Sequence, residues 1–411
     1  MNLYIFNEKR RGAVFGIGTY IRELTYALKN SEINICVVNL TSDKPQIQSE
    51  EIDGIRYWHF PAPINEQLTA DSPKQQELYF RNIVYLFQLH IQDKKDLIFH
   101  LNYYESGQLA EELKNAFECK IVAVAHFCGW GFTVFDNLPR LRYLLNEEKP
   151  DCDSEKLKKS FEQEKYCYSK ADHVICLSKY MKEILCQDYG IDIKKTSVIP
   201  NGILDMTDTK SNRKLLRKKW MISSEEKIIL FAGRIDKIKG LSFLIQAFRT
   251  VLRKFPNCRL MIAGSGNYDM YFQNSNDICT KMTFTGLLEK KQLYELYKIA
   301  DVGVVLSLFE PFGYVAVEMM MHKLPIVVTA TSGLNEVVDE VSGIKIPVTV
   351  LPDSVEINTT LLAKKILYLL QNPIEAKCLG EIARKRYLKE YSSPVFGNKM
   401  ISFYRSLFLI D

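Results

Sequence analysis

The chain has 411 residues, of which 47% are hydrophobic and 25% charged, and its formal net charge is +5. This length and composition suffice for two sizeable cores, so we expect two domains. The charge is small for the size, so it indicates no nucleic-acid partner and does not exclude an anionic substrate. The start, Met1–Asn7, is typical of a short strand and not of a signal peptide, and no apolar run is long enough to span a bilayer. We therefore expect a cytoplasmic protein whose ten cysteines, with no Cys-x-x-Cys pair, are buried free thiols.

Apolar runs alternate with helical periodicity along the first half. We expect strands at Leu3–Phe6, Ile35–Leu40, Leu97–Leu101, Ile121–Phe127 and Val174–Leu177, and helices at Thr19–Leu28, Gln75–His90, Gln108–Phe117, Glu155–Ser169 and Lys179–Tyr189. Such alternation indicates a doubly wound parallel sheet.

The second half repeats the design. Strands are expected at Ile228–Ala232, Arg259–Ala263, Met282–Thr285, Val302–Leu306 and Ile326–Thr329. The predicted fold is α/β with two Rossmann-like domains, residues 1–203 and 204–390, and a final helix within 391–411 that crosses back to the first domain.

A glycine-containing loop, Arg11–Tyr20, follows the first strand and precedes a helix. Gly16 and Gly18 allow the backbone to approach a ligand closely, although a plain tight turn explains them almost as well. The dinucleotide fingerprint is absent, because the third glycine and the following acidic residue are missing.

His126 directly follows the apolar run Ile121–Ala125, which puts it at the carboxyl edge of the first sheet, where α/β proteins bind ligands. His100 ends a comparable strand and is a rival. A single histidine is more often structural, and position favours His126.

A basic loop lies between the strand Ile228–Ala232 and the helix that begins at Leu241. It contains Gly233, Arg234 and Lys239. Arginine can bind phosphate oxygens bidentately and lysine adds a point charge, so the pair suits a diphosphate as ligand and as leaving group. The alternative, a basic turn at a helix start, is disfavoured by the helix dipole.

Two glutamates, Glu310 and Glu318, bracket a strand-to-helix turn with seven residues between them. One carboxylate near each end of a phosphate cradle could accept bonds from a sugar and a ribose. The cradle itself would be the backbone of Phe312, Gly313, Tyr314 and Val315 at the helix start. Taken alone, the two glutamates are more often a cap and a solvated face.

Two further motifs have competing explanations. Asp151-Cys152-Asp153 matches an Asp-x-Asp string that can bind metal, but its place before a helix is typical of an N-cap. With no other ligand cluster, we predict no metal and no cofactor. The basic stretch 210–220 could touch anionic lipid, although we expect a solvated face, and a peripheral membrane contact stays open.

Taken together, the chain resembles the retaining glycosyltransferases of family 4, also called group 1 glycosyltransferases, which have the GT-B fold with two Rossmann-like domains facing a cleft. Three separated motifs carry the resemblance. These are Gly233-Arg234 with Lys239-Gly240, Glu310 with Glu318, and Ser197–Ile203, which contains Asn201 and is similar to the segment that enters the family's second domain.

The resemblance implies transfer of a hexose from a nucleoside diphosphate sugar, UDP-sugar favoured, to a hydroxyl of a saccharide, lipid-linked glycan or peptide, without metal and with retention. It implies that Arg234 and Lys239 hold the diphosphate, Glu318 the ribose, and Glu310 and His126 the sugar. Backbone near Gly266 and Leu287 would contact the base. A sugar phosphorylase of the same fold and a non-catalytic partner subunit are the alternatives, and a nucleotide-sugar epimerase ranks lower because it would lack this charged set.

Overall fold

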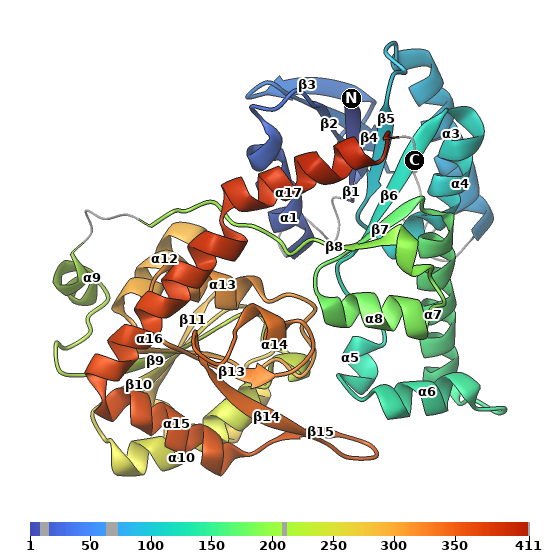
Figure 1. Ribbon diagram of the computed structural model, residues 1–411. Helices are drawn as coiled ribbons and strands as arrows, with labels where there is room; N and C mark the ends of the chain where they lie inside the picture. Colours follow the sequence, from blue (N-terminus) through green and yellow to red (C-terminus); the bar gives the residue numbers. More distant parts are fainter. Residues whose placement is uncertain (9–15, 63–72, 208–211, 410–411) are drawn as a thin grey trace. The chain divides into compact units, whose positions relative to one another are not determined.

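The computed structural model describes residues 1–8, 16–62, 73–207 and 212–409. It divides the chain into two compact units (Figure 1). Unit 1 comprises Met1–Gly129, Glu148–Leu204 and Ser393–Asp411, and unit 2 comprises Trp130–Glu147 and Asp205–Ser392.

Unit 1 is built on an eight-stranded sheet of order β3-β4-β2-β1-β5-β6-β7-β8. All neighbouring strands are parallel except the hairpin β3–β4. Its elements are β1 (Asn2–Glu8), α1 (Gly16–Leu28), β2 (Asn34–Ser42), β3 (Gln48–Ile52), β4 (Ile55–Pro61), α3 (Pro73–His90), β5 (Leu97–Leu101), η1 (Tyr104–Ser106), α4 (Gly107–Ala116), β6 (Cys119–Ala125), α7 (Cys152–Lys170), β7 (His173–Cys176), α8 (Lys179–Gln187), η2 (Ile193–Lys195), β8 (Thr196–Val198) and α17 (Ser393–Ser406).

Unit 2 has a seven-stranded sheet of order β11-β10-β9-β12-β13-β14-β15, parallel except for β14–β15. Its elements are α5 (Gly131–Val134), α6 (Leu138–Asn146), α9 (Arg213–Lys219), β9 (Lys227–Ala232), η3 (Lys237–Lys239), α10 (Leu241–Lys254), β10 (Cys258–Ala263), α11 (Asp269–Gln273), η4 (Cys279–Lys281), β11 (Met282–Gly286), α12 (Lys290–Ile299), β12 (Val302–Val305), α13 (Tyr314–Met321), β13 (Ile326–Ala330), α14 (Leu334–Val337), β14 (Ile344–Val350), β15 (Val355–Ile357), α15 (Thr359–Gln371), α16 (Pro373–Arg386) and the π-helix η5 (Tyr387–Tyr391). The predicted α/β class with two mainly parallel sheets is confirmed.

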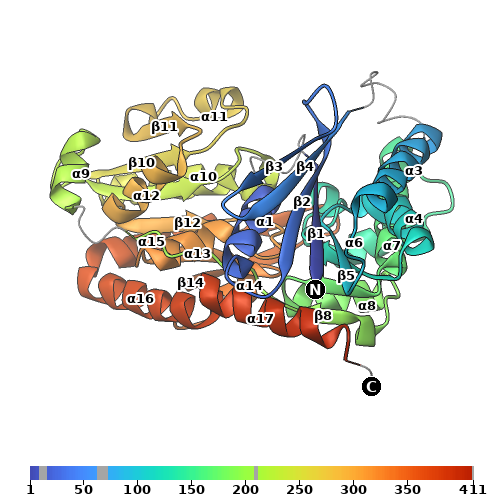
Figure 2. The ribbon, with the colours of Figure 1, turned by 90° about the horizontal axis from the view of Figure 1, so that it is seen from above.

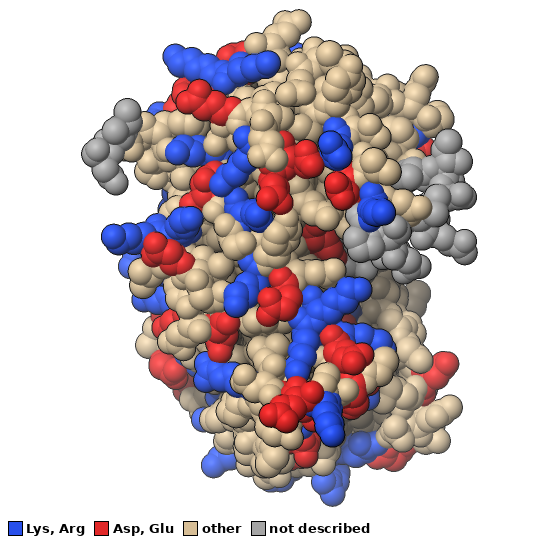
Figure 3. Space-filling view, turned by 90° about the vertical axis from the view of Figure 1, so that its right-hand side faces the viewer, with Lys and Arg blue, Asp and Glu red and all other residues tan. Residues whose placement is uncertain are grey.

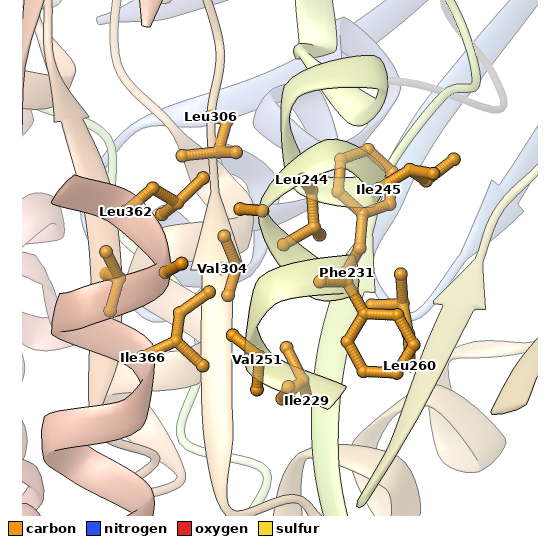
Figure 4. Packing of buried hydrophobic residues seen from close by; sticks show 14 of the residues in the cluster. Ile229, Phe231, Leu244, Ile245, Val251, Leu260, Val304, Leu306, Leu362 and Ile366 are labelled. Atoms are coloured by element: carbon orange, nitrogen blue, oxygen red, sulfur yellow. The ribbon is translucent and has the colours of Figure 1, made fainter. Parts of the chain in front are cut away.

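The core of unit 2 explains why its central strands are apolar along their whole length. Strands β9 and β12 have both faces covered, so consecutive residues rather than alternate ones are buried. Helix α10 contributes a helical stripe that includes Leu244, Ile245 and Val251, and α15 contributes Leu362 and Ile366 (Figure 4). These side chains pack the start of α10 against the sheet. This packing positions the loop between β9 and α10.

Helix pairs complete each unit. In unit 1, α3 lies beside α4 (Figure 2) and α17 packs against α1. Phe396, Met400 and Tyr404 of α17 are buried there. In unit 2, α10 packs on α15 and α13 on α16. The last helix of the chain therefore belongs structurally with the first.

The surface shows both signs of charge. Lys and Arg side chains are interspersed with Asp and Glu on the face drawn in Figure 3, in keeping with the small net charge. Most of α9 is exposed, as expected of a solvated face. Arg217 is the exception, because it is buried and donates to the carbonyl oxygen of Ile299 at 2.9 Å. Residues 210 and 211 of that stretch lie outside the described residues.

The cysteines also differ from expectation. Five of the ten are buried, whereas Cys152, Cys279 and Cys378 are exposed. Cys152 and Cys279 begin helical segments and Cys378 lies within α16, so none of the three sits in an apolar run that would predict burial. Across the described ranges, no helix has the length and apolarity needed to cross a membrane.

Candidate functional site

The predicted basic loop connects the carboxyl end of β9 to α10 in unit 2. Gly240 ends the short helix η3 with a φ of 67°, and a Cβ on it would lie 2.2 Å from the carbonyl oxygen of Leu306. The amide of Leu308 donates to the carbonyl of Ile238 at 2.7 Å. The loop therefore lies directly on the chain that leaves β12, the neighbour of β9 in the sheet.

This contact brings together two of the predicted residues that are far apart in sequence. Lys239 Nζ lies 2.5 Å from Glu310 Oε2. The hydroxyl of Ser307 donates to the same carboxylate oxygen at 2.9 Å. The Lys239 and Glu310 side chains are about one-fifth exposed, at 21% and 18%. The result is a partly shielded ion pair at the carboxyl edge of the sheet, where α/β proteins bind ligands.

Arg234 lies in the same loop but makes different contacts. Its guanidinium is 3.1 Å from the carboxylate of Asp236 and stands 5.3 Å from the centroid of the Phe132 ring. The side chain is 37% exposed. A planar, partly exposed guanidinium can still offer donors to an anionic ligand.

Glu318 is placed on α13 in a more enclosed environment. Its side chain is 3% exposed; Tyr297 donates its hydroxyl to Oε2 at 2.9 Å, and Lys290 forms an ion pair with Oε1. Burial and the nearby carboxylate raise the pKa of Tyr297 well above its usual value, so it remains a donor. Ribose hydroxyls at Glu318 would have to share or displace these partners.

The start of α13 has the geometry expected of an anion site. Gly313 adopts a φ of 102°, which favours glycine, and precedes Tyr314 and Val315 in the first turn. Phe312 is buried and packs edge-on against Tyr314 at 5.2 Å. The first N–H groups of a helix have no carbonyl partner within it, so they favour a negatively charged ligand.

Two predicted base contacts lie at the ends of neighbouring strands. Gly266, with a φ of 155°, faces the loop after β9, where a Cβ would lie 2.3 Å from the carbonyl of Ile235. Gly233 has a φ of 142° but open space at its Cβ position. Leu287 follows β11 and is 62% exposed. Gly266 thus has a packing reason of its own, whatever it binds.

The remaining predicted residues lie in unit 1. His126 follows β6 directly, and its Nε2 donates to Asn102 Oδ1 at 2.9 Å, because the Asn102 amide itself donates to the carbonyl of Phe6. Burial lowers the pKa of His126 to about 3, so the ring is neutral. The rival His100 is fully buried between the hydroxyls of Tyr20 and Tyr404, which is a structural role.

Asn201 and the glycine loop complete this group. Asn201 is 1% exposed, and within the described part of the chain its side-chain oxygen has no hydrogen-bond partner. Gly16 is the first residue of α1 and Gly18 lies in its first turn. Residues 11–15 of the predicted loop lie outside the described residues.

The residue types that ligate metals are dispersed over the described ranges. Within them, no three His, Cys, Asp or Glu side chains are grouped so as to hold a metal ion. Asp151 is the N-cap of α7 and accepts from the amide of Ser154 at 2.8 Å, as expected. Metal independence stays a prediction.

Several contact residues escaped the sequence reasoning. Ser307 donates to the Glu310 carboxylate, and Ser332 accepts from the Glu310 backbone amide. Lys290 and Tyr297 bind the Glu318 carboxylate. Ser307 could have been suspected, because it directly follows the apolar run that contains β12 and lies three residues before Glu310. The other three carry no local signal, since their partners come from distant strands and helices.

Both halves of the chain match family models. Residues 212–386 match the model described as Glycosyl transferases group 1, and residues 14–204 match Glycosyltransferase Family 4. The chain belongs to the group 1 glycosyltransferases.

Among relatives of this group, an uncharacterised glycosyltransferase of Methanocaldococcus jannaschii is 37% identical over 182 residues, 42% of this chain and 46% of the relative. The matched part thus spans less than half of that relative. A D-inositol 3-phosphate glycosyltransferase of Xylanimonas cellulosilytica is 26% identical over 81% of this chain and 80% of its own.

Solved structures agree on the fold of this group 1 glycosyltransferase. The sucrose-phosphate synthase of Thermosynechococcus elongatus superposes with a TM-score of 0.75 at 23% identity, covering 99% of both chains. Anabaena HepE in complex with UDP and glucose gives 0.72 at 16% identity, covering 99% of this chain and 100% of its own. The GT-B fold class is confirmed.

Proposed function

We propose that this chain transfers a hexose from a nucleoside diphosphate sugar, with UDP favoured, to an acceptor hydroxyl on a saccharide, a lipid-linked glycan or a peptide. The observation that carries the proposal is the Lys239–Glu310 pair at 2.5 Å, formed between the loop that also carries Arg234 and the residues just before the N-terminus of α13. Cations and helix N–H groups for a diphosphate thus lie next to a carboxylate that could bind sugar hydroxyls. The UDP and glucose bound to HepE support this donor class.

The chemistry asked of these residues is electrostatic. As the bond between sugar and diphosphate breaks, negative charge grows on the leaving phosphate, and Lys239 and Arg234 stabilise it. Glu310 faces the sugar, where positive charge develops at the anomeric carbon. Without a donor, Lys239 and Glu310 neutralise each other, which keeps both partly shielded charges paired.

Retention of the anomeric configuration is part of the proposal. The Glu310 carboxylate forms an ion pair with Lys239, so it is held by a cation in the absence of donor. A route in which the leaving phosphate itself helps to deprotonate the acceptor suits such a site. His126 of unit 1 is proposed to contact the sugar, and Asn201 is proposed as a substrate-binding residue.

The test is diphosphate binding by variants of one loop. We expect Arg234→Ala and Lys239→Ala each to weaken UDP binding about 30-fold, since losing a charge-assisted contact costs about 2 kcal/mol. Lys237→Ala is the matched control, because Lys237 lies in the same loop and is exposed. Calorimetry that found wild-type affinity in both site variants would refute the site.

A donor panel then tests the reaction. Wild-type protein should release nucleoside diphosphate from one or a few nucleotide sugars and should leave sugar 1-phosphates untouched. Turnover of a sugar 1-phosphate with release of phosphate would instead identify a phosphorylase.

A further inference from the structure

A short segment from the first half of the sequence packs within unit 2. This segment, Trp130–Glu147, carries α5 and α6. The Trp130 ring lies 4.8 Å from the Phe309 ring, and a Cβ on Gly131 would meet that ring at 2.3 Å. The segment is therefore closely packed against the residue that precedes Glu310.

Asp136 forms the polar part of this contact. Its Oδ2 accepts the hydroxyl of Thr331 at 2.6 Å and the amide of Ser332 at 3.0 Å. Both Thr331 and Ser332 are buried. Hydrogen bonds to an ionised carboxylate are about twice as strong as those between neutral groups, so this is a firm anchor.

Ser332 links Asp136 to the backbone of Glu310. Its hydroxyl accepts from the Glu310 amide at 2.8 Å and donates to the Glu310 carbonyl at 3.1 Å. Ser332 has a φ of 39°, and Phe135 beside Asp136 has a φ of 56°. Such left-handed conformations cost non-glycine residues about 1 kcal/mol or more and persist only where the surroundings impose them.

We propose that Asp136 is a positioning residue that sets the backbone of Glu310 through Ser332. The inference deepens the proposed function and rests on it, because it supposes that Glu310 acts on the donor sugar. Without the Asp136 carboxylate, Ser332 has less to hold it in its left-handed conformation, and Glu310 loses both backbone bonds. A displacement of about 1 Å at a reacting group can lower a rate about a hundredfold.

The experiment uses Asp136→Ala, Asp136→Asn and a control that removes a different contact of the same segment. Asp353→Asn is the control, because Asp353 pairs with Arg140 of α6 on the surface and has no bond to Ser332 or Glu310. The first readout is hydrogen exchange of the peptide that contains the Glu310 amide, in protein without donor. The second is the split between kcat and donor KM.

We expect Asp136→Ala to speed exchange at Glu310 about tenfold and to lower kcat about tenfold or more, with UDP affinity changed less than about twofold. Asp136→Asn, which keeps one acceptor oxygen, should fall between it and the wild type, and Asp353→Asn should match the wild type. In a Glu310→Gln background, Asp136→Ala should lower kcat by less than about threefold further, because the two act as a unit.

Unchanged exchange in both Asp136 variants would overturn the inference, and so would faster exchange with unchanged kcat. Equal effects of Asp353→Asn would also overturn it. Exchange is measured without any substrate, so it separates the two proposals. If the Asp136 variants exchange faster but the wild type uses no nucleotide sugar, the positioning role of Asp136 would be supported and the proposed function refuted.

Discussion

At the scale of residues, Glu310 and Glu318 show how one short stretch provides two carboxylates with different properties. Glu310 is next to Lys239 and partly open, whereas Glu318 is enclosed by Tyr297 and Lys290. A buried carboxylate without partners would be strongly destabilising, so the contacts of Glu318 have a structural purpose as well. The two glutamates should therefore respond differently to the same substitution.

We expect Glu310→Gln mainly to lower kcat, because the lost charge matters most when the anomeric carbon becomes positive. Glu318→Gln should mainly raise the donor KM, since a ribose contact is similar in ground and transition states. Steady-state kinetics with the donor found in the panel measure both. Glu340→Gln, an exposed carboxylate of the same unit, is the control. The reverse assignment, or equal small effects, would contradict these roles.

At the scale of elements, the turn from η3 into α10 depends on close backbone contact with the end of β12. Gly240 makes that contact possible, because it has a positive φ and no side chain facing the carbonyl of Leu306. The buried stripe of α10 then holds the helix on the sheet. This packing therefore also fixes the position of Lys239, which is one residue earlier in the chain.

Gly240→Ala should lower the melting temperature by more than about 5 °C and also weaken UDP binding, because strain and a clash with backbone act together. Gly286→Ala is the matched control in the same unit, with a φ of 73° but open space around its Cβ position. It should lower the melting temperature by about 2–4 °C, since it adds only the conformational cost. Scanning calorimetry measures both melting temperatures. Equal shifts in the two variants would show that the close approach at Gly240 is unimportant.

At the scale of the whole molecule, buried titratable groups link the stability of the protein to pH. Glu164 of α7 is fully buried, accepts the Gly129 amide at 2.6 Å and is bonded by the hydroxyl of Tyr189. Burial raises the pKa of Glu164 from 4.5 to about 7, with a smaller contribution from Glu105, although the hydrogen bonds oppose the shift. The folded state thus holds this proton more tightly than the unfolded state.

The contribution of Glu164 to stability is therefore complete below pH 4.5 and is lost as the pH rises through 7, by an amount on the order of 3 kcal/mol. Glu164→Gln stays neutral at every pH. We therefore expect its stability, relative to that of the wild type, to increase as the pH is raised from 5 to 8. Thermal melts at the two pH values measure this, with Glu162→Gln, exposed on the same helix, as control. A difference between variant and wild type that does not change with pH would contradict the raised pKa.

The sequence by itself determined that most of the central segments are strands, although not always where they end, because apolar periodicity is local; β6, for example, was expected at 121–127 and spans Cys119–Ala125. It was therefore enough to predict two parallel sheets and the loops that carry Arg234, Lys239 and Glu310. It missed β3, which is exposed along its length, β8 and β15, which have three residues each, and also β4 and β14, which have seven residues each. Such strands are stabilised by pairing with neighbours rather than by a pattern of their own.

Only the tertiary structure decided which side chains meet. Lys239 reaches Glu310 because β9 and β12 are neighbours in the sheet although β10 and β11 separate them in sequence. In the same way, Asp136 reaches Ser332 across 195 intervening residues. These contacts depend on strand order and on the packing of distant segments, and no local pattern of residue types encodes either one.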